Sequence, residues 1–145
     1  MKLIKCILVA MTLMVLIPQQ TKAKQILVPK GYMFGFIANF TDSVVYLTDI
    51  QTVDSVWYDD KSKILLGRSS YSNQLRDYFA NKLNKPHRTC VTIFALTRKD
   101  AEKKYLKMRK LYTVKYAGKY DVRNLNENEF HFTPVNMDPD DTDNQ

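Results

Sequence analysis

The sequence predicts an α+β domain, a two-layer structure in which two helices cover one face of a mostly antiparallel sheet. Two observations lead to this class. Segments rich in β-branched and aromatic residues alternate with segments of helical periodicity, in the order strands, helix, strand, helix, strands. The composition, with 45% hydrophobic and 26% charged residues, is that of an ordinary globular domain.

The N-terminus has the pattern of a secretory signal peptide. Lys2 and Lys5 precede an apolar run from Cys6 to Ile17, and a polar stretch that ends in the small residue Ala23 follows. The apolar run is shorter than the roughly 20 residues that a membrane-spanning helix needs. We therefore expect residues 1–23 to be a cleaved signal peptide, residues 26–134 to form one domain, and the product to be periplasmic or secreted.

The first half of the domain should supply three strands and a helix. Met33 to Phe40, Val44 to Asp49 and Thr52 to Tyr58 are rich in apolar and aromatic residues and are separated by turn-forming residues. Gly35 marks either a β-bulge or a point where another segment approaches the backbone closely. A helix should then begin at a serine cap, Ser69 or Ser70, and end before Pro86.

A strand that runs directly into a basic helix is the clearest structural signal in the chain. The segment from Arg88 to Phe94 has apolar residues at both odd and even positions, which predicts a central place in the sheet. Thr97, with Asp100 three residues later, is a capping pattern that starts a helix. The apolar positions of this helix are Ala101, Tyr105, Met108, Leu111 and Tyr112, and basic residues cover the opposite face.

The chain after this helix predicts two short strands and an acidic tail. Tyr120 to Leu125 and Glu129 to Thr133 have the composition of strands. Residues 135–145 contain four Asp residues and no apolar periodicity, so we expect a disordered tail. Its removal should change the free energy of unfolding by less than about 0.5 kcal/mol.

The folded part carries a clear excess of positive charge. Residues 24–134 include 19 Lys and Arg against 11 Asp and Glu. Such a surface favours anionic partners, namely acidic glycans, anionic lipid headgroups or nucleic acid, and export makes nucleic acid the least natural of them. We expect a cell-envelope glycan or an envelope protein as partner, with no nucleic acid and no stable membrane insertion. The oligomeric state stays open.

The sequence predicts no catalytic residue, no cofactor and no metal site. Cys90 is the one cysteine left after removal of residues 1–23, so an internal disulfide cannot form. His87 lies three residues before it, a spacing that points the two side chains to opposite faces of a strand. We interpret Cys90 as a core residue with a raised thiol pKa. A reactive thiol paired with a His87 that lies outside the strand is the alternative.

The chain holds more tyrosine than a core needs. It has nine Tyr, seven Phe and one Trp, and each buried tyrosine hydroxyl requires a hydrogen-bond partner. We therefore expect an exposed aromatic and basic surface, suited to sugar rings with acidic substituents. The candidate residues of this surface are Trp57, Tyr58, Arg68, Tyr71, Arg88 and Arg98.

The strand that ends in Phe94 and the basic helix after Thr97 together resemble the second half of a SPOR domain. This family is a small ferredoxin-like module that grips the glycan strands of peptidoglycan. The matching residues, 88–110, cover less than a fifth of the chain. The family usually has glycine just before the aromatic residue, where this chain has Ile93. The resemblance implies a ferredoxin-like fold and a glycan ligand.

The chain after residue 23 also resembles a group of uncharacterised small exported proteins of Gram-negative gut bacteria. Three phrases carry this resemblance: Phe-x-x-x-Phe-Thr-Asp-Ser from Phe36, Leu-Leu-Gly-Arg from Leu65, and Pro-His-Arg-Thr-Cys from Pro86. It implies a periplasmic or secreted setting and supplies no activity.

These observations rank three kinds of function. The first is an exported, non-catalytic binding module of the cell envelope, with a glycan such as peptidoglycan as its ligand. The second is a structural or protein-interaction accessory factor of the envelope. An enzyme comes third, and it would need a pocket that joins His87, His131 and an acidic residue.

Overall fold

The computed structural model describes residues 24–138, so the signal peptide expected over residues 1–23 lies outside the described residues. Its strands are β1 (Gln25–Ala38), β2 (Val44–Thr48), β3 (Gln51–Asp59), β4 (Thr89–Ala95) and β5 (Asp121–Leu125). Its α-helices are α2 (Arg68–Asp77) and α3 (Arg98–Lys110), which continue as short π-helical turns, η1 (Tyr78–Lys82) and η2 (Leu111–Lys115). The α+β class and the mostly antiparallel sheet are confirmed, with β2 and β5 as the parallel pair.

β1 is the central strand of the sheet and uses both of its edges. Tyr32 and Met33 pair with β3 and also with β4, so β3 and β4 lie on opposite edges of β1. Phe36 and Ile37 pair with both β2 and β4, which puts β2 on the same edge as β3. The central place that we predicted for the strand from Arg88 to Phe94 is wrong, because within residues 24–138 β4 pairs with β1 alone. Apolar residues on both faces of a strand indicate that both faces are covered. They do not indicate whether the strand pairs with a neighbour at both of its edges.

Gly35 lies at a bulge and at a close approach, as its position in the sequence suggested. The partners of β1 shift by one residue between β2 and β3, from Phe36 opposite Leu47 to Met33 opposite Gln51. At this break the Gly35 amide donates to the Thr48 hydroxyl at 2.8 Å instead of to a backbone carbonyl. The α2 helix packs directly over the glycine, a contact that a side chain there would block.

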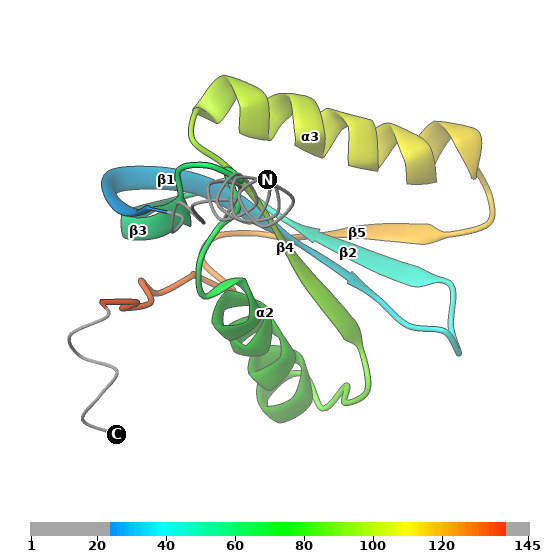
Figure 1. The fold of residues 1–145 in the computed structure, drawn as a ribbon. Coiled ribbons are helices and arrows are strands. Elements are labelled where there is room, and N and C mark those ends of the chain that lie inside the picture. Colours follow the sequence, from blue (N-terminus) through cyan, green and yellow to red (C-terminus); the bar gives the residue numbers. More distant parts are fainter. Residues whose placement is uncertain (1–23, 139–145) are drawn as a thin grey trace, which may run out of the picture.

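The two helices lie on opposite faces of the sheet, with α3 above it and α2 below it in Figure 1. Neighbouring residues of β1 point to opposite faces. The Phe34 ring meets the Tyr105 ring of α3 edge-to-face at 5.2 Å, whereas a Cβ on Gly35 would lie 2.6 Å from a methyl carbon of Leu75 in α2. The expected two-layer arrangement, with both helices on one face as in a ferredoxin-like module, is therefore wrong. Helical periodicity shows which side of a helix is apolar, and it leaves open which face of the sheet that side covers.

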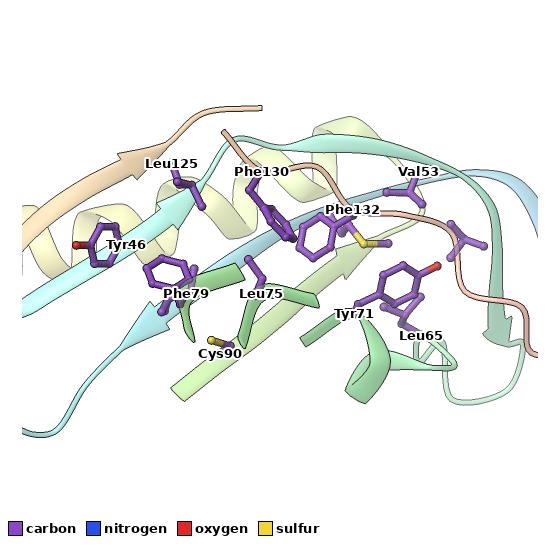
Figure 2. Packing of buried hydrophobic residues seen from close by; sticks show 13 residues of the cluster. Tyr46, Val53, Leu65, Tyr71, Leu75, Phe79, Cys90, Leu125, Phe130 and Phe132 are labelled. Carbon is purple, nitrogen blue, oxygen red and sulfur yellow. The ribbon is translucent and has the colours of Figure 1, made fainter. Parts of the chain in front are cut away.

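The larger core lies between the sheet and α2. Its buried members are Met33, Ile37, Tyr46, Val53, Val56, Leu65, Tyr71, Leu75, Phe79, Cys90, Leu125, Phe130 and Phe132. Figure 2 shows Phe130 and Phe132 side by side above Leu75, with their rings edge-to-face at 4.9 Å. The layer under α3 is thinner, since Ala101 is the one buried residue of that helix.

Two glutamine side chains take the place of a strand partner for the segment after β5. Gln51 is fully buried; its Nε2 donates to the Phe130 carbonyl and its Oε1 accepts the Phe132 amide, each at 2.8 Å. Gln74 binds the backbone of Thr133 in the same way: its Nε2 donates to the Thr133 carbonyl at 3.0 Å, and its Oε1 accepts the Thr133 amide at 2.9 Å. The last strand predicted from the sequence is wrong for this reason: the backbone of this segment is satisfied by side-chain amides instead of by a ladder.

The first residues of the expected acidic tail pack against the domain. The Val135 amide donates to the Tyr71 hydroxyl at 3.1 Å, and the Val135 side chain packs against the core. Val135 and Met137 also cover Gly67, which has a φ of +66° and starts α2 without a side-chain cap. The domain therefore extends past residue 134, and the part of the tail over residues 139–145 lies outside the described residues.

The Gln51 contact can be tested by a change that keeps the volume of the side chain. Gln51→Met leaves the Phe130 carbonyl and the Phe132 amide buried without partners, and each such group costs about 1–3 kcal/mol. We expect the free energy of unfolding in urea to fall by about 3 kcal/mol. Gln74→Met is the matched control, because water can replace its exposed amide, and it should cost less than about 1 kcal/mol. Equal losses in the two variants would contradict the assignment.

Two truncations test where the domain ends. A chain that stops at Pro134 lacks the Val135 hydrogen bond and side-chain packing, so its free energy of unfolding should fall by about 1 kcal/mol. A chain that stops at Asp138 keeps both and should stay within about 0.5 kcal/mol of the full chain. Thermal and urea unfolding measure the difference, and identical stability of the two truncated chains would place the domain end at residue 134 after all.

Candidate functional site

The six residues expected to form one aromatic and basic surface lie apart. Trp57 and Tyr58 lie on β3, Arg68 and Tyr71 on α2, Arg88 just before β4, and Arg98 at the start of α3. Tyr71 is fully buried, and burial raises the pKa of its hydroxyl. Tyr58 and Arg88 are also buried, while Arg98 is exposed and pairs with Glu102 at 3.2 Å. These residues therefore do not share a surface that a ligand could cover.

Arg88 holds the loop between β1 and β2 against the start of β4. Its Nη2 pairs with Asp42 at 2.5 Å, and its Nη1 donates to the Val44 carbonyl at 3.1 Å. The guanidinium lies over the Tyr46 ring, 5.1 Å from the centroid. All these contacts are internal to the domain, so the role of Arg88 is structural.

The outer edge of β4 is closed by side chains. Thr92 donates its amide to the Ser72 hydroxyl at 3.2 Å, and its carbonyl accepts the Arg68 guanidinium at 2.9 Å. The Phe94 carbonyl accepts Lys104 Nζ at 2.6 Å. An edge strand whose outward groups are already bonded is a poor template for an added strand. Arg68, which we expected on a sugar-binding surface, serves this edge instead.

An open groove lies between α3 and β4, and we call it the lysine groove. It encloses about 600 Å³, within the range of small-ligand sites. Its floor and walls are the apolar residues Phe34, Ile93, Met108, Leu111 and Val114, and its rim is formed by Lys104, Lys107, Lys110 and Lys115. No acidic residue lines it. The groove thus combines an apolar trough with an uncompensated row of positive charge.

The groove exists because α3 starts beside β4 and then crosses the sheet toward β5. Tyr105 packs on Phe34 of β1, and its hydroxyl donates to Asn124 of β5 at 3.3 Å. This ties the helix to the β5 side of the sheet. Val91 and Ile93 of β4 point to the same face as Phe34 but remain only half-buried. The uncovered strip of β4 becomes one wall of the groove.

The rim lysines differ in how far they are engaged by the protein. Lys104 donates to the Phe94 carbonyl, and Lys115 Nζ lies 5.7 Å from the centroid of a tyrosine ring. The side chains of Lys107 and Lys110 are exposed and make no hydrogen bond or ion pair within the part of the chain that the structure describes. These two ammonium groups are the ones available to an anionic ligand.

A cluster of tyrosines follows the groove at the end of α3. The rings of Tyr112, Tyr116 and Tyr120 contact one another with centroids 5.1 to 6.1 Å apart. Lys115 and Lys119 lie within 6 Å of the Tyr116 centroid. An aromatic and basic surface is therefore present, but at residues other than the six that the sequence singled out. The rings meet edge-to-face or tilted, and Tyr112 also contacts the Phe36 ring at 5.2 Å, so much of the ring surface is used within the domain.

Sequence reasoning missed the groove although its spacing was visible. We assigned Met108 and Leu111 to the buried side of the helix, and both are half-buried on its flank. Lys104, Met108, Leu111 and Lys115 follow one another in steps of four, three and four residues, so they form one row on the helix surface. This row has two apolar residues between two lysines, and that pattern could have predicted a groove along the helix.

Cys90 is a core residue, as predicted. It is 6% exposed on the α2 side of β4, and burial raises the pKa of its thiol to about 11. His87 lies outside the strand and is exposed. Within residues 24–138, no three or more His, Cys, Asp and Glu residues are grouped so as to hold a metal ion. A thiol with such a pKa stays protonated at neutral pH and is a weak nucleophile.

Comparisons with protein-family models, with curated proteins and with solved structures found no match for this chain. Among the described residues, no helix has the length and apolar character needed to cross a membrane.

The thiol of Cys90 gives a pH-dependent prediction. Its pKa is near 9 when unfolded and about 11 in the folded chain, so its contribution to stability is complete below pH 9 and is lost as the pH rises toward 11. The stability advantage of the native chain over Cys90→Ala should shrink by roughly 1–2 kcal/mol across this range. Urea unfolding at pH 8 and pH 10.5 measures it. A thiol reagent should label the folded chain slowly at pH 8, and fast labelling there would contradict the buried thiol.

Proposed function

We propose that this chain is an exported, non-catalytic binding module of the bacterial cell envelope, and that it holds an anionic envelope component in the lysine groove. The observation that supports this most directly is the lining of the groove, with four lysines on the rim, five apolar residues inside and no acid. The lysines of such a site attract a negatively charged ligand. Burial of apolar surface of the ligand against the inner residues then stabilises the complex.

The charge of the domain as a whole supports the same proposal. The positive excess of residues 24–134 is concentrated along α3, which contains Lys99, Lys103, Lys104, Lys107 and Lys110 besides two arginines. Two smaller hollows adjoin the groove at the start of α3 and add Lys63, Arg68 and Lys103 to the same stretch of surface. An acidic partner would therefore meet further basic residues beside the groove, although Lys63 and Lys103 are paired with Asp60 and Asp100.

The alternative, a structural or protein-interaction factor, receives less support. Addition of a strand to a sheet edge is a common way to bind an extended peptide. At β4 this route is obstructed in part, because Ser72, Arg68 and Lys104 already bond the Thr92 amide, the Thr92 carbonyl and the Phe94 carbonyl. The groove lining favours a ligand with negative charge and apolar surface over a peptide strand.

Charge reversal in the groove tests the proposal. Lys107→Glu with Lys110→Glu removes both available cations, and each lysine near an anionic surface contributes about 1 kcal/mol. We expect retention on purified peptidoglycan sacculi or on vesicles of extracted envelope lipids to weaken by at least about tenfold. Co-sedimentation at low and high salt measures the retention, which should also fall as salt rises.

The matched control makes the same change in net charge, but at two lysines outside the groove. Lys61→Glu with Lys99→Glu changes two exposed lysines that line none of the hollows described here. This variant should bind almost as the native chain does. If neither material retains the native chain at low salt, or if the two double variants lose retention equally, the proposal is refuted.

A further inference from the structure

We infer that the ligand of the lysine groove is a single-chain anionic amphiphile, an acyl or alkyl chain that carries one phosphate or carboxylate group. This inference rests on the proposed function and names the chemical class that the groove selects. It follows from three features: the aliphatic lining, the length of the trough and the position of the free lysines.

The lining suits a hydrocarbon chain better than a sugar ring. Sugar rings stack on exposed aromatic faces, yet the one aromatic residue of the groove, Phe34, is fully buried at its base and is covered by Tyr105. The accessible walls are Ile93, Met108, Leu111 and Val114, which offer no hydrogen bond to a hydroxyl group. Val114 is 70% exposed, so a bound chain would cover apolar surface that water now covers.

The length of the trough sets the length of the chain. The lining runs along the helix from Lys104 to Lys115, which at 1.5 Å per residue is about 16 Å. An extended polypeptide advances about 3.5 Å over its three bonds, so an all-trans alkyl chain advances about 1.2 Å per bond. With the head group between Lys107 and Lys110, about 10 Å of the trough remains toward Lys115, which holds about eight carbons of an extended chain.

The head group should lie between Lys107 and Lys110. These lysines stand on the rim, and their aliphatic stems can flank the chain while the ammonium groups stay in water. Neither is engaged elsewhere within residues 24–138, whereas Lys104 is bonded to the edge of β4. A phosphate or carboxylate at this place would complete two charge-assisted hydrogen bonds.

A lone chain fits the groove better than a bilayer surface does. A membrane-bound helix presents a continuous apolar side to the lipid. Here the apolar residues form the inside of a trough between a helix and a strand, with Phe34 at its base. A flat lipid surface would not reach this floor, whereas a single chain that leaves the bilayer or micelle can.

Titration calorimetry with alkyl phosphates, kept below their micelle-forming concentrations, tests the inference. Dodecyl phosphate should bind one molecule per full chain, and inorganic phosphate should not bind measurably. In the series butyl, hexyl and octyl phosphate, each added methylene should strengthen binding by up to about fourfold, and carbons beyond the end of the trough should add less. Dodecyl maltoside, with a neutral head, should bind at least about tenfold more weakly than dodecyl phosphate.

A pair of leucine variants on the same helix supplies the control. Leu111→Gln places an amide in the trough and should weaken dodecyl phosphate binding by about tenfold or more. Leu106→Gln makes the same change at an exposed leucine, 52% exposed, that does not line the groove, and it should bind as the native chain does. Circular dichroism and urea unfolding confirm that both variants are folded.

Five outcomes would overturn the inference. Equal binding of all chain lengths, or equal losses in the two leucine variants, would mean that the trough does not hold the chain. Binding to intact anionic vesicles but not to monomeric dodecyl phosphate would assign the surface to a bilayer. At least tenfold tighter binding by a chain that ends at Asp138 would make the acidic segment 139–145 the occupant. Retention on sacculi without any alkyl phosphate binding would refute the amphiphile but leave the proposed function standing.

Discussion

The pairing of β1 along both of its edges is the constraint on which the rest of the domain depends. One edge carries β2 and β3, which are joined through a bulge, and the other carries β4. This arrangement leaves two faces to cover, and neighbouring residues of β1 alternate between them. Gly35 admits Leu75 on one face, while Phe34 receives Tyr105 on the other. The crossing of α3, and with it the lysine groove, follows from the second contact.

Local signals in the sequence predicted the local elements. Thr97 and Asp100 form the helix cap that their spacing indicated, with the Asp100 amide 3.2 Å from the threonine hydroxyl. The glycine at position 35 lies at a bulge, and Cys90 is buried. Each of these features depends on residues close to one another in the chain or on a strong burial preference of one residue type. Such features can be derived from one sequence without knowledge of its tertiary contacts.

The serine cap expected at Ser69 or Ser70 was wrong, because α2 starts after Gly67 without a side-chain cap. The other features that escaped prediction depend on distant residues. Gln51 bonds the backbone 79 and 81 residues further along, and no pattern around a single glutamine indicates such a partner. The face of the sheet that each helix covers depends on its tertiary contacts with the strands. Apolar periodicity within the helix could not assign that face. The groove arises from the sideways position of α3, fixed by the contact between Tyr105 and Asn124. Tyr71 was expected on a surface because tyrosine is amphipathic, but the Val135 amide satisfies its hydroxyl inside the domain.

The closed edge of β4 also bears on how the chain can misassemble. The seal consists of single side chains that arrive from other elements, Arg68 and Ser72 from α2 and Lys104 from α3. Until both helices dock, the strand presents free amides and carbonyls to any neighbouring chain, and unpaired edges of this kind seed intermolecular sheets. The aggregation hazard of the β4 edge therefore belongs mainly to partly folded states, and the rate at which α2 and α3 dock decides how long that hazard lasts.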